Sequence, residues 1–504
     1  MKDSPNIVFI FPDQHRGDAM GFTGNPVVIT PNLDRLASQG VAFSRCCSNA
    51  PLCMPARASF MTGHYVRRHG VWNNHLEADP DGPSHVRNIR DAGYHTAVIG
   101  KTHLYLHDAE PGHHTRDYQS VLERWGFVDS HELHGPLASY LNNSPYTDYL
   151  AGKDLLEVHR KYIEDYLQDW WIGQSRPWEL PPCPLPAEDH MDSYTGRQAV
   201  KWIKNYHDPK PFYLQVMFPG PHDPFDSPDE YRARYRPADM PTGPMDPPAE
   251  PMPEYVRRAL HRSNMSGMTT EQKQILQTHY YAKLTLIDEQ IGRIIRALEE
   301  KGLLDNTWIV YSSDHGEMLG DHRLSHKVVF YDGALRIPCI VRPPRGASGW
   351  MSGALCDHTD LSATLLEIAG AETIPDSPGR SLVAQVQSGP EDRAAHQGKA
   401  AVISEVVGMV MVRDNRFRLT LQADNLAPTD MFDLENDRTE SNNIVRDPAY
   451  EQDRHRLIHS YVEPIAGWLD QDRLKRFYEK SGPNNTSAHT RNQSLTPAKQ
   501  NPDG

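Results

Sequence analysis

The sequence predicts an α/β fold in which a mostly parallel central sheet carries helices on both faces. Two observations lead to this class. Several short apolar runs are continuous rather than alternating, as is typical of parallel strands buried on both faces. These runs alternate along the chain with segments of helical periodicity, which indicates strand–helix units. The residue pattern changes after residue 385, which predicts a smaller α+β subdomain there.

The first predicted strand spans residues 6–11, and a helix follows it. Thr30 is its expected N-cap, Pro31 lies in its first turn and Gly40 stands just past its end. Further strands are predicted at residues 95–99, 211–218 and 307–312. Each of these strands ends in a short polar segment.

The longest predicted helix spans about residues 271–300, because its apolar residues recur at steps of three and four. Thr270 is its expected N-cap, and Gly302 is expected to end it. In the smaller subdomain, strands are predicted at 402–412 and 417–421, followed by a helix at about 450–469.

The length of 504 residues predicts a large catalytic domain with a smaller companion. We expect the catalytic domain to span 1–385, with an irregular insertion at about 108–208. Its many aromatic residues either form a wall of a substrate pocket or pack the insertion itself. The C-terminal subdomain is expected at 386–480. The polar segment 481–504 is expected to be disordered or ordered only by a partner subunit, which would make a homo-oligomer.

Composition excludes some classes of protein. The formal charge is −14 and no block of Lys and Arg stands out, so the sequence does not predict a nucleic-acid partner. The first apolar run is too short for a membrane span and lacks the features of a signal peptide, so we expect no membrane and a cytoplasmic location. If the substrate is an anion, local cations must overcome the overall negative field.

The chain has six cysteines, and no pair of them has the CxxC spacing of a zinc ribbon. A disulfide framework is the weaker interpretation in a long chain without an export signal. The six cysteines are Cys46, Cys47, Cys53, Cys183, Cys339 and Cys356.

Ionisable side chains and one amide, that of Gln14, follow four of the predicted strands at the point where each strand ends. In open parallel sheets, ligands bind beyond these carboxyl ends. We therefore expect the side chains to meet at one edge of the sheet. In chain order they are Asp13 with Gln14, Lys101 with His103, His222, and Asp314 with His315.

Four of these residues suit one divalent cation. Two carboxylates, an amide oxygen and an imidazole favour Ca²⁺, Mn²⁺ or Mg²⁺. The predicted ligands are Asp13, Gln14, Asp314 and His315. The alternative is that both aspartates only cap loops.

Cys53 lies at the start of a predicted short helix that runs to Gly63, with Pro55 in its first turn. The positive end of the helix dipole and the nearby Arg57 would favour a thiolate or a bound anion. The alternative is an ordinary buried cysteine.

The stretch Cys53-x-Pro55-x-Arg57, continued by Ala58-Ser59-x-x-Thr62-Gly63, resembles the signature of type I sulfatases. Further motifs of this family follow over most of the chain, namely Asp13-Gln14, Thr30 to Leu36, Gly100-Lys101-x-His103, Pro221-His222-x-Pro224-Phe225, Ser313 to Gly316, Lys327, Arg336-Ile337-Pro338 and Phe432 to Asp437. The resemblance implies the fold of the alkaline phosphatase superfamily. It also implies oxidation of the cysteine to formylglycine by a separate formylglycine-generating enzyme.

The chain departs from the commonest sulfatase pattern at several positions. Gln14, Asn74 and His315 resemble the phosphonate monoester hydrolase branch, as does Ala56 in place of a serine. Lys101 and His103, in contrast, follow the sulfatase pattern. We therefore expect a sulfatase acting on aryl sulfates or similar esters. The alternatives are a phosphonate monoester or phosphodiester hydrolase, a choline or carbohydrate sulfatase, and, in a different class, a binding protein with a decayed site.

The resemblance also implies roles for these residues. The hydrated aldehyde made from Cys53 would bind one metal ion, Ca²⁺ before Mn²⁺ or Mg²⁺, and attack sulfur. Arg57, Lys101 and Lys327 would neutralise charge on the sulfuryl oxygens. His222, with Lys327, would protonate the leaving oxygen, and His103 would take the proton that releases sulfate. Asn74 would contact the substrate.

Overall fold

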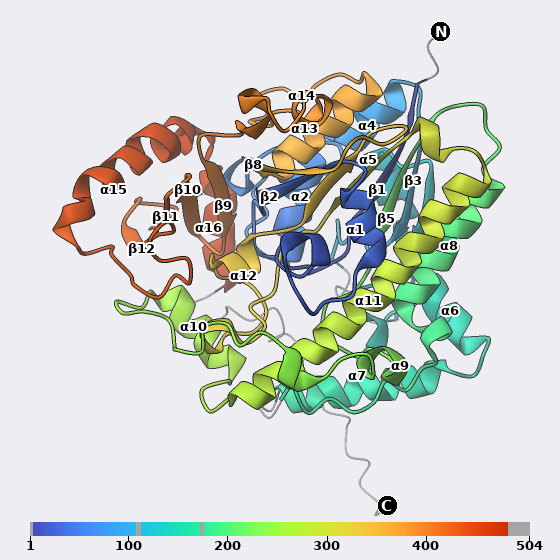
Figure 1. Cartoon of the computed structure of the whole chain (residues 1–504), viewed down its shortest axis with the longest axis horizontal. Coiled ribbons are helices and arrows are strands. Elements are labelled where there is room, and N and C mark those ends of the chain that lie inside the picture. The colour runs from blue at the N-terminus through green and yellow to red at the C-terminus, as the bar shows by residue number, and fades with distance from the viewer. Residues whose placement is uncertain (1–3, 107–111, 172–175, 482–504) are drawn as a thin grey trace, which may run out of the picture.

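The structure, a computed structural model, describes residues 4–106, 112–171 and 176–481. Its centre is an eight-stranded sheet with the order β4-β3-β5-β1-β6-β7-β2-β8 (Figure 1). Within this sheet only β7 runs antiparallel to its neighbours, so the predicted mostly parallel sheet is confirmed. The strands are β1 (Asn6–Ile10), β2 (Val41–Cys47), β3 (His95–Gly100), β4 (Asp129–Glu132), β5 (Phe212–Met217), β6 (Thr307–Ser312), β7 (Cys339–Arg342) and β8 (Trp350–Asp357).

Both faces of the sheet are buried, which explains why its strands are apolar without alternation. In β1, Val8 and Ile10 belong to one hydrophobic cluster, whereas Ile7 and Phe9 belong to another on the opposite face. The first face carries α1 (Pro31–Ala37), α8 (Met191–Asn205) and α11 (Thr270–Glu300). The second carries α2 (Cys53–Thr62), α4 (His85–Asp91) and α13 (His358–Ala369).

The long helix α11 begins one residue earlier than predicted. Its N-cap is Thr269, not Thr270, because the Thr269 hydroxyl accepts the backbone N–H of Gln272 while the Gln272 side chain accepts the N–H of Thr269. This reciprocal pairing satisfies two donors at once, so it outweighs a cap at Thr270.

The predicted insertion at 108–208 is more regular than expected in its described parts. It adds β4 to the edge of the sheet and contains α8, which packs on α11. Its other helices are α5 (Gln119–Trp125), α6 (Pro145–Ala151) and α7 (Leu156–Trp171). Elsewhere lie α3 (Val66–His69), α9 (Asp229–Arg232), α10 (Glu254–Ser263), α12 (Asp332–Leu335) and α14 (Val383–Gln387).

A separate four-stranded antiparallel sheet lies near the C-terminus, to the left in Figure 1. Its strands are β9 (Val402–Val406), β10 (Met409–Arg413), β11 (Phe417–Gln422) and β12 (Pro428–Asp433). The prediction of one strand at 402–412 was wrong, because the chain turns at Val407 and Gly408. These two residues have φ angles of 45° and 78°, and positive φ at both central residues is what a tight hairpin turn requires.

Helical structure completes the C-terminal region. The segment at about 450–469, predicted as one helix, is helical, but its helical pitch changes along the chain. It begins as α15 (Glu451–Leu457), and shorter turns of different pitch follow over Ile458–Val462 and Glu463–Trp468. The last described helix is α16 (Gln471–Ser481), and from residue 482 on the predicted polar tail lies outside the described residues. Among the described helices, none has the length and apolar character needed to cross a membrane.

Candidate active site

The candidate residues meet at the carboxyl edge of the sheet. Four of the strands that they follow, β3, β5, β1 and β6, are consecutive neighbours in the sheet. Asp13 even continues the pairing beyond the end of β1, through an isolated bridge to Pro221. Because parallel neighbours end at the same edge, residues hundreds of positions apart in sequence become adjacent.

Asp13 is fully buried and holds two cations. Its Oδ2 atom accepts from Arg57 Nη2 at 3.0 Å and from Lys101 Nζ at 2.6 Å. Burial would raise the pKa of Asp13, but Lys101 and the other cations around it outweigh burial and hold this pKa well below its usual range. The carboxylate is therefore ionised at neutral pH.

Asp314 is the second buried carboxylate, and Arg57 connects it to the first. Arg57 Nε donates to Asp314 Oδ2 at 2.9 Å. The other oxygen of Asp314, Oδ1, accepts the backbone N–H groups of Gln14 and His315, each at 2.9 Å. One guanidinium thus bridges carboxylates that follow the first and fourth of these strands in chain order.

The ring of His315 presents one nitrogen to Cys53. His315 Nδ1 lies 2.9 Å from the Gly316 carbonyl, which can only accept, so this nitrogen carries the proton. Burial lowers the pKa of His315 and keeps the ring neutral. Nε2 is then an acceptor, and it lies 3.2 Å from Cys53 Sγ. This tautomer is the one that ligates a metal.

These donors fit a divalent cation. One ligand atom from each of Asp13, Cys53, Asp314 and His315 lies within 4.8 Å of all the others. Ca²⁺ binds its ligands at about 2.3–2.6 Å, so ligands on opposite sides of the ion stand about 5 Å apart. Carboxylate oxygens and a neutral imidazole are suitable donors for such an ion.

Gln14 takes a strained backbone conformation to reach the same place, with a φ angle of 75°. Its amide oxygen accepts from Lys327 Nζ, and its amide nitrogen donates to Glu317 Oε2 at 2.5 Å. Burial would lower the pKa of Lys327, but nearby Cys53 and Asp13 outweigh it and raise this pKa. Lys327 is therefore a cation beside the predicted ligands.

Cys53 is the first residue of α2, and the start of this helix is capped from a distance. The N-cap residue Leu52 has no side chain that can accept a hydrogen bond. Asn74 Oδ1 instead accepts the backbone N–H of Met54 at 3.0 Å. Asn74, predicted to bind substrate, thus has a contact that holds the helix start under Cys53. Its role toward substrate stays a prediction.

His222 follows β5 and is held by its own neighbour. His222 Nδ1 lies 2.8 Å from the Asp223 carbonyl oxygen and 3.2 Å from Asp223 Oδ1. The same carboxylate lies 3.4 Å from His326 Nδ1 and accepts the hydroxyl of Tyr166, a residue of α7, at 3.1 Å. Sequence reasoning missed these three partners, although Asp223 and His326 stand directly beside predicted residues.

His103 lies on the loop after β3, half-buried, with a φ angle of 51°. A buried carboxylate anchors this loop, since the hydroxyls of Thr102 and Tyr105 both donate to Glu132. Burial raises the pKa of Glu132 to about 7. Glu132 was also missed, and its only sequence signal is its position at the end of β4.

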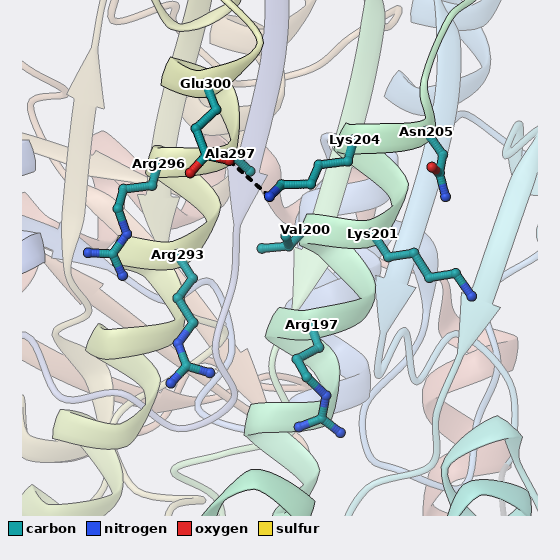
Figure 2. A pocket seen from close by; sticks show the side chains of 9 residues that line it. All are labelled: Arg197, Val200, Lys201, Lys204, Asn205, Arg293, Arg296, Ala297 and Glu300. Atoms are coloured by element: carbon teal, nitrogen blue, oxygen red, sulfur yellow. Dashed lines mark ion pairs between the residues drawn. The ribbon is translucent and has the colours of Figure 1, made fainter.

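A basic groove lies away from these residues, between α8 and α11 (Figure 2). Its volume is about 520 Å³, and its cations are Arg197, Lys201, Lys204, Arg293 and Arg296. Lys204 pairs with Glu300 at 2.9 Å across it. None of the predicted site residues lines this groove, so it is not the candidate active site.

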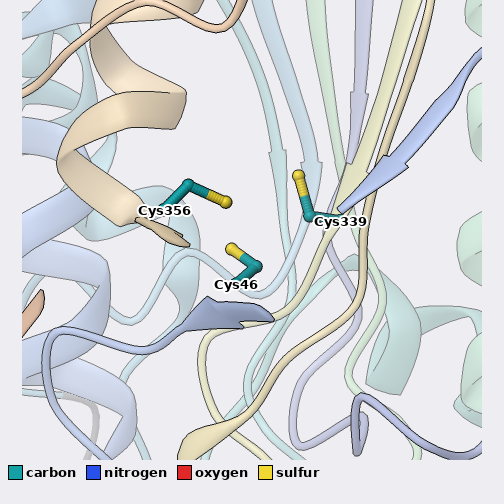
Figure 3. A group of neighbouring side chains, drawn as sticks. All are labelled: Cys46, Cys339 and Cys356. Atoms are coloured by element: carbon teal, nitrogen blue, oxygen red, sulfur yellow. The ribbon is translucent and has the colours of Figure 1, made fainter. Parts of the chain in front are cut away.

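Three thiols also meet inside the protein, from β2, β7 and β8 (Figure 3). The sulfur atoms of Cys46, Cys339 and Cys356 lie within 4.8 Å of one another. All three residues belong to the apolar cluster that includes Phe9, and all six cysteines of the chain are free. The three thiols thus pack as small apolar side chains.

Comparison with known protein families shows to which family the chain belongs. The family model described as Sulfatase matches residues 5–371. The chain belongs to the sulfatase family. A second model, described as N-sulphoglucosamine sulphohydrolase, C-terminal, matches residues 320–464 and so includes the four-stranded sheet.

Known relatives of this sulfatase match it almost from end to end. The arylsulfatase of Clostridium perfringens is 28% identical, over 95% of this chain and 98% of its own. The multifunctional alkaline phosphatase superfamily protein PehA of Trinickia caryophylli is 28% identical, over 94% and 98%. The solved phosphonate monoester hydrolase of Silicibacter pomeroyi superposes with a TM-score of 0.74 at 26% identity, over 93% and 96%. The fold is that of the alkaline phosphatase superfamily, and the family is one of sulfuric ester hydrolases, as the motifs indicated.

Proposed function

We propose that this sulfatase hydrolyses sulfate monoesters of the aryl sulfate type to an alcohol and inorganic sulfate, using a formylglycine made from Cys53. The observation that supports this most is the placement of Cys53. It begins a helix, its sulfur lies 3.2 Å from His315 Nε2 and 3.7 Å from Asp13 Oδ1, and cations surround it. A nucleophile at this point would meet an anionic ester among groups that stabilise it.

Two groups would complete the site. A divalent cation, Ca²⁺ before Mn²⁺ or Mg²⁺, would be held by Asp13, Gln14, Asp314, His315 and the group made from Cys53. Such an ion supplies Lewis-acid stabilisation of the sulfuryl group and favours the ionised nucleophile. A formylglycine supplies a hydrated aldehyde with two hydroxyls, one to attack sulfur and one to release sulfate by collapse of the ester. A separate formylglycine-generating enzyme would be the maturation partner.

The chain's own cations would bind the sulfuryl oxygens. Arg57 and Lys101 already converge on Asp13, and Lys327 contacts Gln14. Fixed cations in a buried site stabilise developing negative charge because they need not reorganise during the reaction. They also overcome the net charge of −14, which would otherwise repel an anionic substrate.

Two histidines would move the protons. With Nδ1 of His222 held by Asp223, its Nε2 would donate a proton to the leaving oxygen, assisted by Lys327. His103, on the loop anchored by Glu132, would accept the proton that accompanies sulfate release. The two roles thus fall on residues that follow adjacent strands, β5 and β3.

The proposal is tested by peptide mass spectrometry across Cys53 in protein from a host that makes formylglycine. We expect the thiol to be replaced by an aldehyde, together with release of sulfate from 4-nitrophenyl sulfate. An unmodified Cys53 in protein that is nevertheless fully active would overturn the proposed nucleophile. Fully modified protein that is inert toward every sulfate ester tested would overturn the proposed reaction.

A second candidate is hydrolysis of phosphonate monoesters or phosphate diesters at the same site. Gln14 and His315 favour it, and so does the likeness to the phosphonate monoester hydrolase of Silicibacter pomeroyi. Rates on 4-nitrophenyl sulfate and 4-nitrophenyl phenylphosphonate, which share a leaving group, decide between the two. We expect the larger kcat/KM for the sulfate because Lys101 and His103 follow the sulfatase pattern. Choline and sugar sulfates belong in the same panel.

A further inference from the structure

A buried set of ionic side chains lies directly under the loop that carries His222. The set consists of His190 and Asp192 at the start of α8, Asp226 at the end of the loop, and Lys283 of α11. His190, Asp192 and Lys283 come from two helices that cover one face of the sheet, whereas Asp226 belongs to the loop itself. None of them belongs to the motifs that indicated the site.

Lys283 is the centre of this set. Its side chain is 1% exposed, and its ammonium group lies 2.7 Å from Asp226 Oδ1. The same nitrogen donates to the backbone carbonyl of His222 at 3.0 Å and to that of Pro224 at 2.9 Å. An ammonium group has three protons, so these three acceptors use all of them. Lys283 therefore has no donor left for a ligand, and its contacts hold the loop.

A second helix fixes the loop on the other side of His222. Asp192 Oδ1 accepts the backbone N–H of Gly220 at 2.8 Å. The approach is so close that a Cβ atom at Gly220 would lie 2.3 Å from Asp192 Oδ2 and 2.8 Å from Lys283 Cε. A larger residue there would displace both side chains. The backbone is thus held before, at and after His222.

Lys283 supplies the positive charge that faces the two carboxylates of this set. Cys183, His190 and Asp226 each place a ligand atom within 4.8 Å of the others, as a metal site would. The ammonium of Lys283, bound to Asp226, already supplies a positive charge at this place. Burial would lower the pKa of Lys283, but Asp226 and Asp192 outweigh it and raise this pKa.

We infer that Lys283 is a positioning residue that holds the His222 loop in the geometry needed to protonate the leaving oxygen. This inference rests on the proposed function, because it takes His222 as the acid. Lys283 itself touches neither the substrate nor Cys53. Its loss lets the backbone at His222 shift, and proton transfer weakens steeply as a donor moves out of hydrogen-bond reach.

The test compares wild type with Lys283→Met on a series of aryl sulfates whose leaving phenols differ in acidity. Good leaving groups need little protonation, whereas poor ones depend on the acid. Because a positioned acid contributes roughly 10²–10⁴-fold, we expect kcat to fall about tenfold on 4-nitrophenyl sulfate and about a hundredfold on phenyl sulfate. KM and the formylglycine content should stay close to wild type.

Lys283→Met leaves Asp226 buried without its cation, which can prevent folding. A second variant, Lys283→Met with Asp226→Asn, removes both charges together and should show the same steeper dependence on the leaving group. The matched control is Lys273→Met. Lys273 is another buried lysine of α11 that binds a carboxylate, Asp321 at 2.6 Å, but its contacts lie away from the His222 loop.

A uniform fall across the series, or no fall, in the folded variants would overturn the inference. The same steepening in the Lys273 control would also overturn it, because the effect would then follow from general destabilisation. Failure of the proposed function is distinguishable, since wild type would then hydrolyse none of the aryl sulfates. The inference holds only if wild type is active and the loss grows as the leaving phenol becomes less acidic.

Discussion

Two clusters of buried charge in this molecule differ in their ratio of cations to carboxylates. In the C-terminal sheet, one guanidinium, that of Arg418, serves two carboxylates, with Asp430 at 2.7 Å and Glu440 at 2.6 Å. At the carboxyl edge of the main sheet the ratio is reversed, because the two carboxylates of Asp13 and Asp314 lie among three cations, Arg57, Lys101 and Lys327. We call these the Arg418 cluster and the Asp13 cluster.

The difference in ratio shows in the pKa values. Burial raises the pKa of Glu440 to about 7 although Arg418 opposes it. At Asp13 burial also acts to raise the pKa, but Lys101 and the other cations outweigh it and lower the pKa far below normal. A cluster with surplus carboxylate is closed to anions, whereas a cluster with surplus cations can accept one. The first is suited to joining β11 to β12, and the second to binding a sulfate ester.

The largest expected effect comes from a substitution that removes Cys53, the proposed nucleophile beside the Asp13 cluster. Cys53→Ala should lower kcat for 4-nitrophenyl sulfate by at least about 10⁴-fold, because removal of a nucleophile leaves only the binding contacts. The fold should persist, since the change removes one buried sulfur atom. Steady-state rates and a thermal melt check both points. Retention of wild-type kcat would rule out Cys53.

Removal of the metal should lower kcat by about a thousandfold, because a Lewis acid supplies several kcal/mol of stabilisation. A chelator followed by excess Ca²⁺ or Mn²⁺ should restore the rate. In a thermal shift assay, the ion at a hundred times its Kd should stabilise the protein by about 2.7 kcal/mol. Asp314→Asn is the control and should lose this shift. An undiminished shift in that variant would place the metal elsewhere.

A pair of substitutions contrasts the two clusters directly. Lys101→Met should lower kcat about a hundredfold with little change in stability, because Arg57 still pairs with Asp13. Arg418→Met should instead destabilise the fold by about 3–5 kcal/mol, because two buried carboxylates lose their cation. Its kcat per folded molecule should match wild type. Urea denaturation and active-site-normalised rates measure the two effects, and a reversed outcome would refute the assignment of the clusters.

The smallest effect concerns Glu132, a buried carboxylate bound by the hydroxyls of Thr102 and Tyr105. Burial raises its pKa in the fold to about 7, from an ordinary value of 4.5. A raised folded pKa means that this contribution to stability is complete below pH 4.5 and is lost as the pH rises through about 7. Wild type should therefore lose roughly 3 kcal/mol of unfolding free energy through Glu132 between pH 4.5 and pH 8. Glu132→Gln cannot ionise at this position, so it should not show this loss.

Urea denaturation of wild type and Glu132→Gln at both pH values measures this difference. The comparison cancels other titrating groups, since they are shared by the two proteins. Identical pH dependence in the two proteins would show that folding does not shift the pKa of Glu132.

The sequence by itself determined the fold class, the strands that carry chemistry and the residues that meet at their ends. This was possible because each motif is local, standing directly after an apolar run, and because parallel strands collect such ends at one edge. The cysteine motif was equally readable, since Cys53 and Arg57 lie within one short helix. The sequence also marked the 413–416 turn that separates β10 from β11.

Only the tertiary structure decided what holds these residues in place. Asn74 caps α2 from outside the helix, Glu132 anchors the loop of His103, and Lys283 holds the loop of His222. In the last two cases the contact joins two elements that no motif connects. A long polar side chain can reach any of several neighbours. Its partner is therefore set by which helices and strands pack together, and a linear pattern does not contain that information.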